Sequence, residues 1–519
     1  MFDLIIKNGT LIDGTRQPRF RADLGIQGDQ IKAIGDLGDA NAAQIIDVTQ
    51  KIVTPGFVDV HTHSDTWLLK TPHLISKTTQ GFTTEVIMAD GISYAPVNQH
   101  TIHDWIYYLR ALNGLRLEEY TGWESLADYM ALLDGRTAQN VITHIPYANL
   151  RTMACGFGRA VPDDYQMRQI IEGVERGMDE GAVGLSTGMD YLAEWFATTD
   201  ELVEACRPMA AQQGLYVTHI RYKKGLVEGV AEAVEIGKRA GVPVHISHLK
   251  GTNEQEVEDL LTYIDTVAVN EVDFSFDVYP YVPSSTMLNY LLPYEVWEDG
   301  PRQVLSHLAD PNVRAKFAHG LQFSPPDAAH IAWLPGKENS HHQGKLLSDY
   351  AKDVNKTPAD ALCDLLIEEN LAVLLVFLRG DDIYVEPSLA HETFMIGSDG
   401  IYHEDGAIHP RQYGSASKIL GQYVREKKLF SLEEAIYKLS TFPSKRFGLT
   451  NRGLLQEGLL ADVVVFDPET VADRATYQNP HQLSVGIEYV IVNGTPIIAD
   501  SEPIDQVLPG RALKYHQAL

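Results

Sequence analysis

The 519-residue sequence predicts an α/β protein: a (β/α)8 TIM-like barrel with a small β-sandwich domain formed by both chain ends and an insertion in the barrel. Three observations lead to this fold class. Apolar runs alternate with amphipathic stretches through the middle of the chain, both ends are rich in strand-like segments, and the alternation breaks once. The expected division is a β domain at 1–55 plus 450–519, a barrel at 56–449 and an insertion at about 283–360.

The barrel prediction depends on eight short apolar runs, each bounded by turn-forming or polar residues. They lie at residues 57–60, 84–88, 141–146, 182–186, 216–220, 242–247, 272–278 and 394–398. Amphipathic stretches at residues 163–180, 199–213, 226–240 and 254–269 fall between some of these runs. Strands that alternate with helices indicate a parallel sheet with crossover helices, and eight such units close into a barrel.

The chain ends have a different pattern. Residues 2–8 alternate between apolar and polar side chains, and Asn8-Gly9 and Asp13-Gly14 are turn-forming pairs. Near the other end, residues 462–467 and 488–494 are also strand-like. Because the two ends of a chain often meet, we expect one β domain built from both.

The alternation stops after residue 283 and does not resume until about residue 360. So long an interruption in a compact domain is usually a functional insertion or lid. A ninth apolar run at residues 371–377 exceeds the barrel's count, and we expect it to be an extra strand beside the barrel.

The composition excludes several classes of partner. A net charge of −28 argues against nucleic acid and against anionic membrane surfaces, so an anionic substrate needs local cations. We expect no membrane span and no secretory signal. The three scattered cysteines suggest neither disulfides nor a thiolate metal site, which predicts a cytoplasmic protein. The sequence leaves the oligomeric state open, and an oligomer is compatible with it.

The first barrel strand ends in His61-Thr62-His63, and this pair predicts half of a metal site. Alternate strand residues point to the same face, so both imidazoles aim at one point. Imidazole is a common ligand of zinc. Taken alone, the pair is also compatible with a polar strand end.

Other strand ends supply further ligand-type side chains. His219 ends the fifth run, His248 follows the sixth and Asp399 follows the eighth. Barrel active sites lie at the C-terminal ends of the strands, and buried polar groups are costly unless paired. We therefore expect a metal centre on this rim. His245 is out of phase with His248, and we expect it to be structural.

The sequence resembles the amidohydrolase superfamily, and within it the D-aminoacylase (N-acyl-D-amino-acid deacylase) group. The resemblance extends over nearly the whole chain. Its most specific segments are Thr218-His219-Ile220-Arg221, Ile246-Ser247-His248-Leu249-Lys250 and Gly397-Ser398-Asp399-Gly400.

This resemblance implies a set of roles. His219 and His248 would hold a tightly bound Zn²⁺, His61 and His63 would line a second, weaker metal position, and Asp399 would be the catalytic acid/base as well as a metal ligand. The substrate carboxylate would be bound by Lys250, Tyr279, Ser285 and Arg411, with Tyr281 and Ser284 as near-equivalent candidates. The substrate would be a small N-acyl-D-amino acid.

One position departs from the family pattern. Asp90 stands where family members carry a cysteine. Carboxylate is a harder ligand than thiolate, so we expect Asp90 to bind the metal and to make the site less selective for zinc, or more evenly binuclear. The alternative is that Asp90 caps the following turn.

Two other functions stay open at this point. A cyclic-amide hydrolase (hydantoinase or dihydropyrimidinase-like) or a dipeptidase could use the same site, although such relatives typically use a modified lysine and no lysine lies at the fourth strand end. A catalytically inactive scaffold is the alternative from another class, and the retained histidines and Asp399 argue against it.

Overall fold

The computed structural model describes residues 1–322 and 324–516, and its centre is a ring of parallel strands. The strands are β6 (Phe57–Asp59), β7 (Phe82–Ile87), β8 (Asn140–Thr143), β9 (Ile145–Pro146), β10 (Gly184–Gly188), β11 (Leu215–His219), β12 (Val244–Ile246), β13 (Phe274–Val278) and β17 (Phe394–Ile396). β8 and β9 together fill the position of the third predicted run. The predicted α/β barrel is therefore confirmed.

Backbone contacts close the ring at two seams between hydrogen-bonded sheets. At one seam, the Val60 amide donates to the Ile396 carbonyl at 3.4 Å, and Thr62 bridges Gly400. At the other, the Val183 amide donates to the Thr143 carbonyl at 2.9 Å. The strands thus run in parallel around the barrel, and their C-terminal ends meet at one rim.

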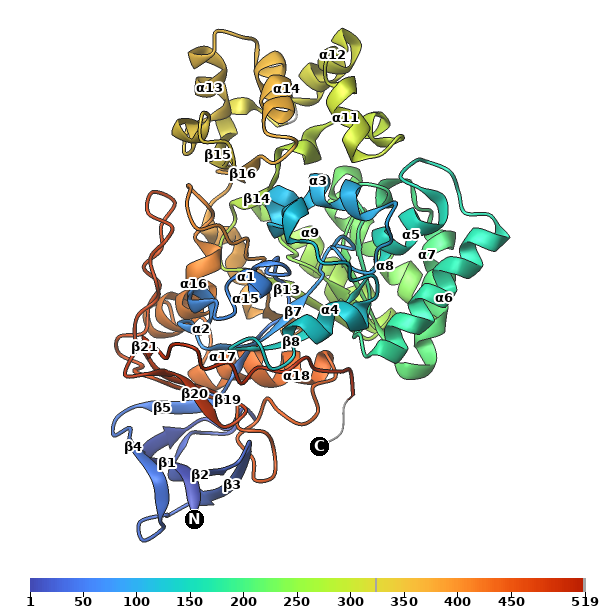
Figure 1. The fold of residues 1–519 in the computed structure, drawn as a ribbon. Helices are drawn as coiled ribbons and strands as arrows, with labels where there is room; N and C mark the ends of the chain where they lie inside the picture. The colour runs from blue at the N-terminus through green and yellow to red at the C-terminus, as the bar shows by residue number, and fades with distance from the viewer. Residues whose placement is uncertain (323, 517–519) are drawn as a thin grey trace.

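Helices cover the outside of the barrel (Figure 1). Along the chain they are α1 (Trp67–Lys70), α2 (Ile75–Thr78), α3 (Ile102–Asn113), α4 (Leu126–Leu133), α5 (Tyr147–Cys155), α6 (Asp164–Glu180), α7 (Thr199–Cys206), α8 (Leu226–Ala240), α9 (Glu254–Tyr263), α10 (Val269–Glu271), α15 (Glu386–Ala390), α16 (Arg411–Lys418), α17 (Leu432–Ile436) and α18 (Phe442–Arg446). Within the described residues, every helix is too short or too polar to cross a lipid bilayer.

Local chemistry sets the limits of α6. The Asp163 side chain accepts from the Tyr165 and Gln166 amides, and the Gln166 side chain accepts from the Asp163 amide, which completes a capping box. The helix ends at Gly181, whose φ of 102° suits glycine. Gly177 lies against Ile145 of β9, where a Cβ atom would come within 2.5 Å of that side chain. These features seat the helix closely on the barrel.

A separate unit interrupts the barrel between β13 and β17. It contains the antiparallel sheet β14 (Ser284–Met287), β16 (Leu374–Phe377) and β15 (Ala329–Trp333), with α11 (Pro301–His307), α12 (Pro311–Gly320), α13 (Leu347–Asp353) and α14 (Pro358–Glu368). Figure 1 shows these helices on the opposite side of the barrel from β1–β5.

The ninth apolar run lies outside the barrel, as predicted, and its last four residues form β16, the central strand of this small sheet. The sequence did not show that this strand belongs to the insertion. Its residues are buried because β14 and β15 pair with it on both edges, and a run buried in this way has the same apolar pattern as a barrel strand. The interruption therefore extends beyond residue 360 to at least Phe377.

Both chain ends contribute to one nine-stranded sheet. Its strands are β1 (Phe2–Leu11), β2 (Phe20–Gln27), β3 (Gln30–Gly35), β4 (Ala42–Asp47), β5 (Ile52–Pro55), β18 (Val463–Phe466), β19 (Ile487–Val492), β20 (Thr495–Ala499) and β21 (Glu502–Pro503). The two halves join where β5 pairs antiparallel with β18. Buried side chains from both halves, such as Leu24 and Val463, share one apolar cluster.

Candidate metal centre and active site

The six predicted metal-site residues lie together at the C-terminal rim of the barrel. They are His61, His63, Asp90, His219, His248 and Asp399, and all six are buried. Each stands at or just beyond the end of a barrel strand, which is why residues far apart in the sequence converge.

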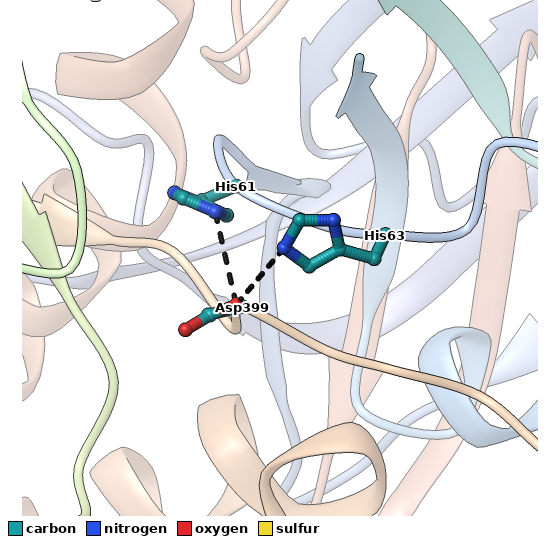
Figure 2. Close-up of side chains that lie close together, drawn as sticks. All are labelled: His61, His63 and Asp399. Carbon is teal, nitrogen blue, oxygen red and sulfur yellow. Dashed lines mark ion pairs between the residues drawn. The ribbon is translucent and has the colours of Figure 1, made fainter. Parts of the chain in front are cut away.

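Asp399 joins the two histidines of the first strand (Figure 2). Its Oδ1 atom lies 3.2 Å from His63 Nε2 and 3.7 Å from His61 Nε2. These three side chains place one ligand atom each within 4.8 Å of one another, a spacing suited to one metal ion.

Asp90 lies between three histidines that follow two strands, β6 and β12. Its Oδ1 atom is 3.6 Å from His61 Nε2 and 3.8 Å from His248 Nε2, while its Oδ2 atom is 3.6 Å from His63 Nε2. His61, Asp90 and His248 form the second group of potential ligands among the described residues. A carboxylate in this place can contact two metal positions at once.

His219 and His248 face each other across the rim. His219 Nδ1 lies 2.9 Å from His248 Nε2, within hydrogen-bond distance, so these two ring nitrogens point toward each other. Behind His219, its Nε2 atom is 3.6 Å from Asp190 Oδ2, which is too long for a hydrogen bond. The Asp190 carboxylate therefore acts on this imidazole through its charge.

The chemistry of this cluster fits a divalent metal. His61 Nε2 and Asp90 Oδ1 are buried and have no hydrogen-bond partner among the described residues. Unpaired buried polar atoms are costly, and a cation held by both would satisfy them. The imidazole and carboxylate donors suit zinc and similar ions.

The electrostatic surroundings keep both rim carboxylates ionised. Burial would raise the pKa of Asp399, but the charge of Arg411 and the contact with His63 outweigh it, and this pKa lies well below its usual range. Burial opposes ionisation of Asp90 too, and His61 and His248 hold its pKa well below the usual range. Both groups are therefore available as anionic ligands or proton acceptors.

A cavity of about 310 Å³ opens from this cluster toward the insertion. Its walls include His219, His248 and Asp399 from the rim, together with Lys250, Tyr279 and Ser285. The predicted substrate-binding residues other than Arg411 thus line one cavity with three predicted metal-site residues. The insertion contributes the opposite wall, including Tyr290, Leu291 and Phe377.

Arg411 lies behind the cavity. It is fully buried, its Nη1 is 2.8 Å from Asp399 Oδ2, and its Nη2 donates to the Ser285 carbonyl at 3.1 Å. Its Nε has no hydrogen-bond partner among the described residues. The guanidinium therefore contacts the candidate catalytic carboxylate directly.

Sequence reasoning missed several residues of this region. Tyr191 and Tyr222 line the cavity, and Lys77 is buried beside Asp59, whose Oδ2 accepts from Lys77 Nζ at 2.5 Å. The Ser398 hydroxyl also donates to Asp59, at 2.6 Å, next to Asp399. Loop tyrosines and a lysine on a short helix carry no periodic signal that would place them here.

A comparison with known protein families shows which family the chain belongs to. The Amidohydrolase family matches residues 44–300 and 394–498, more than half of the chain. The chain belongs to the amidohydrolase family, and the resemblance inferred from the sequence is confirmed. The unmatched residues 301–393 contain the helices α11–α14 and most of the insertion's sheet.

Within the family, the chain is similar to N-acyl-D-amino-acid deacylases. It is 35% identical to D-aminoacylase of Alcaligenes xylosoxydans xylosoxydans, over 96% of this chain and 94% of the relative. It is 34% identical to N-acyl-D-glutamate deacylase of the same organism, over 99% and 96%. Both likenesses span the barrel, the insertion and both chain ends.

Solved structures show the same similarity to N-acyl-D-amino-acid deacylases. The N-acyl-D-glutamate deacylase of Bordetella bronchiseptica, in complex with zinc and a phosphonate mimic of the tetrahedral intermediate, is 33% identical with a TM-score of 0.85, covering 99% of each chain. A D-hydantoinase structure is only 17% identical with a TM-score of 0.56, so it shows a shared fold alone.

Proposed function

We propose that this chain is a metal-dependent amide hydrolase that removes the acyl group from N-acyl-D-amino acids and yields a carboxylate and a free D-amino acid. The observation that carries the proposal is the cavity in which His219, His248 and Asp399 face Lys250, Tyr279 and Ser285. Full-length similarity to D-aminoacylase and to N-acyl-D-glutamate deacylase supports this substrate class.

The metal ligands are assigned as follows. His219 and His248 hold the tighter ion, His61 and His63 line the second position, and Asp90 and Asp399 supply carboxylate oxygens. Zinc is the proposed metal because a related deacylase structure carries it. When bound, a divalent metal polarises a carbonyl oxygen and lowers the pKa of a water molecule.

Asp399 does the proton transfer in this scheme. Its ionised carboxylate accepts the proton of the attacking water and returns it to the departing amine, which leaves poorly until it is protonated. The ion pair with Arg411 at 2.8 Å orients this carboxylate. One side chain thus serves both steps.

The substrate carboxylate is assigned to the cationic side of the cavity. Lys250 Nζ donates to the backbone carbonyls of Tyr281 and Pro283, at 3.1 and 3.4 Å, and stands 3.6 Å from the centre of the Tyr279 ring. The unpartnered Nε of Arg411 adds a second cationic donor close by. Arg411 and Lys250 would bind one substrate carboxylate. Burial and the charge of Arg411 hold the pKa of Lys250 well below its usual range, and a bound carboxylate would raise it. The Ser285 hydroxyl, which donates to the Leu375 carbonyl at 2.6 Å, would turn to the same carboxylate.

A substrate comparison tests the activity. Purified protein with defined zinc content is assayed with an N-acetyl-D-amino acid, its L-enantiomer and a hydantoin. Turnover of the D-compound alone is expected. Hydrolysis of the hydantoin alone would favour the cyclic-amide alternative, and turnover of none of the three by the zinc-loaded protein would favour an inactive scaffold.

Asp90 is the proposed ligand that distinguishes this chain from cysteine-bearing relatives. Replacing it (Asp90→Ala) is expected to lower the metal content of the purified protein, because the side chain contacts both His61 and His248. Elemental analysis of parent and variant measures this. Unchanged metal content would show that Asp90 only caps its turn.

Three further assignments belong to the same proposal. The strands of both chain ends are assigned to one β domain at 1–55 plus 450–519, supported by their common sheet; the β-sandwich form of this domain is part of the proposal. The barrel is assigned to 56–449. A cytoplasmic location is supported by the three cysteines, none of which forms a disulfide.

A further inference from the structure

A buried carboxylate at the end of β13, Asp277, lies beneath the metal-site histidines. Its Oδ2 atom is 2.9 Å from His245 Nε2 and 3.7 Å from His61 Nδ1. Its Oδ1 atom accepts from the His248 backbone amide at 2.9 Å. Asp277 is fully buried and does not line the cavity, so it touches the site only through other residues.

The contacts behind Asp277 fix the protonation pattern of His245. A carboxylate oxygen only accepts hydrogen bonds, so His245 Nε2 must carry the proton that it donates to Asp277. His245 Nδ1 then accepts from the Ser275 hydroxyl at 2.8 Å. Ser275, His245 and Asp277 thus form one directed chain that ends under His61, which explains why His245 points away from the cavity.

Asp277 favours a proton on His61 Nδ1 through its charge, because the distance of 3.7 Å between Oδ2 and Nδ1 is too long for a hydrogen bond. The His61 Nδ1 atom faces Asp277, while its Nε2 atom faces Asp90 at 3.6 Å and Asp399 at 3.7 Å. A proton on Nδ1 leaves the Nε2 lone pair directed at the two carboxylates, where a metal would bind.

Gly397 leaves the space for this approach. A Cβ atom at residue 397 would lie 2.3 Å from Asp277 Oδ1 and 2.8 Å from the His61 Cβ. Contacts this short do not occur, so a side chain here would push the carboxylate or the imidazole aside. The glycine therefore allows Asp277 and His61 to pack together.

We propose that Asp277 is a positioning residue for metal binding: it holds His61 in the tautomer that presents Nε2, and it anchors the backbone of His248. This inference rests on the metal centre of the proposed function. It adds a group that acts through the ligands and touches neither metal nor substrate.

The test measures metal affinity without turnover. Metal-free protein is titrated with zinc against a chromophoric chelator. Asp277→Asn keeps the size and an acceptor for the His248 amide but removes the charge under His61. We expect the dissociation constant of the position that includes His61 to rise about 10–100-fold, the usual effect of losing such a partner.

A matched control separates positioning from general loss of stability. Glu201 is another buried carboxylate, paired with Arg151 at 2.8 Å and outside the cavity lining. Glu201→Gln is expected to lower the thermal midpoint of the metal-free protein and to leave zinc affinity unchanged. Parental zinc affinity in Asp277→Asn would overturn the proposal.

A milder variant covers the case in which Asp277→Asn does not fold. Gly397→Ala leaves every polar group in place and adds one Cβ atom, which would lie 2.3 Å from Asp277 Oδ1 and 2.8 Å from the His61 Cβ and so would push the carboxylate and the imidazole apart. Weaker zinc binding at the position that includes His61 is expected here too, and parental zinc binding would overturn the proposal. If the parent protein itself binds no zinc, the proposed function fails as well; if only the variants match the parent, this inference alone fails.

Discussion

Three of the six candidate metal-site residues occupy a backbone conformation that most non-glycine residues avoid. Asp90, His248 and Asp399 have φ values of 56°, 39° and 48°, in the left-handed region. Such a conformation costs of order 1–3 kcal/mol for a non-glycine residue and persists only where its surroundings enforce it. Here it turns each side chain from the strand end toward the common centre. The backbone conformation that strains these three residues therefore also brings their side chains together.

Neutralising the candidate catalytic carboxylate, Asp399, should slow turnover. Asp399→Asn is expected to reduce kcat by about 10²–10⁴, because an amide cannot accept and return the proton. Steady-state kinetics on an N-acetyl-D-amino acid measure this. Asp405→Asn is the control, since that exposed carboxylate contacts Trp333 and not the site. A kcat within tenfold of the parent would exclude Asp399 as the acid/base.

At the element scale, the insertion holds the loop that connects Asp399 to Arg411. In β15, the Ala332 carbonyl accepts from the Ala407 amide at 2.8 Å, and His330 Nε2 donates to the Ala407 carbonyl at 2.8 Å. The Trp333 ring stacks on His403 at 3.9 Å. The insertion therefore forms a wall of the cavity and also supports the loop beyond the candidate catalytic residue.

The free energy of unfolding should depend on pH because of His403. Burial lowers the pKa of His403 to about 3 from 6.5, while its Nε2 donates to the Ala111 carbonyl. Between these pH values the unfolded chain binds a proton that the folded chain does not, so stability falls as the pH falls below 6.5. Each pH unit in this window costs about 1.4 kcal/mol for one such group.

Replacing His403 should make the free energy of unfolding less dependent on pH. His403→Gln is expected to lose about 1 kcal/mol less unfolding free energy than the parent between pH 6 and pH 5. Denaturant unfolding at both pH values measures this, with the exposed His100→Gln as control. Equal losses in parent and His403→Gln would contradict the burial of a neutral His403.

At the scale of the whole molecule, the C-terminal segment ties the barrel to the sheet of the chain ends. Leu513 donates its amide to the Val141 carbonyl of β8 at 2.7 Å, and the Val141 amide donates to the Arg511 carbonyl at 2.9 Å. The Leu513 side chain is buried in a cluster with Val58, Ile142 and other barrel residues. The last described residues thus complete one end of the barrel.

Truncating Leu513 should destabilise the protein without changing its chemistry. Leu513→Ala is expected to cost about 2–4 kcal/mol of unfolding free energy, as for other buried leucines, and to lower the thermal midpoint. Leu483→Ala is the control, because that leucine is 36% exposed. Equal midpoints for the two variants would show that the C-terminal segment contributes no packing.

The sequence alone predicted the features that depend on the pattern of neighbouring residues. Strand periodicity and strand-helix alternation predicted the barrel, and the strand ends predicted His61, His63, His219, His248 and Asp399 as a cluster. Contacts between distant strands left no such signal: Asp277 and Lys77 acquire their partners only when the barrel closes. The run at 371–377 was correctly placed outside the barrel, but its membership of the insertion depends on pairing with β14 and β15, which are distant in sequence and leave no local pattern.

Dependence on zinc and selectivity for the D-enantiomer can be measured in a single experiment. The protein, stripped of metal and then reloaded with zinc, is given a racemic N-acetyl amino acid, and the free amino acid is resolved on a chiral column. The account predicts the D-amino acid alone, formed by the zinc-loaded protein and not by the stripped one. Equal release of both enantiomers, or release of the D-amino acid without metal, would contradict it.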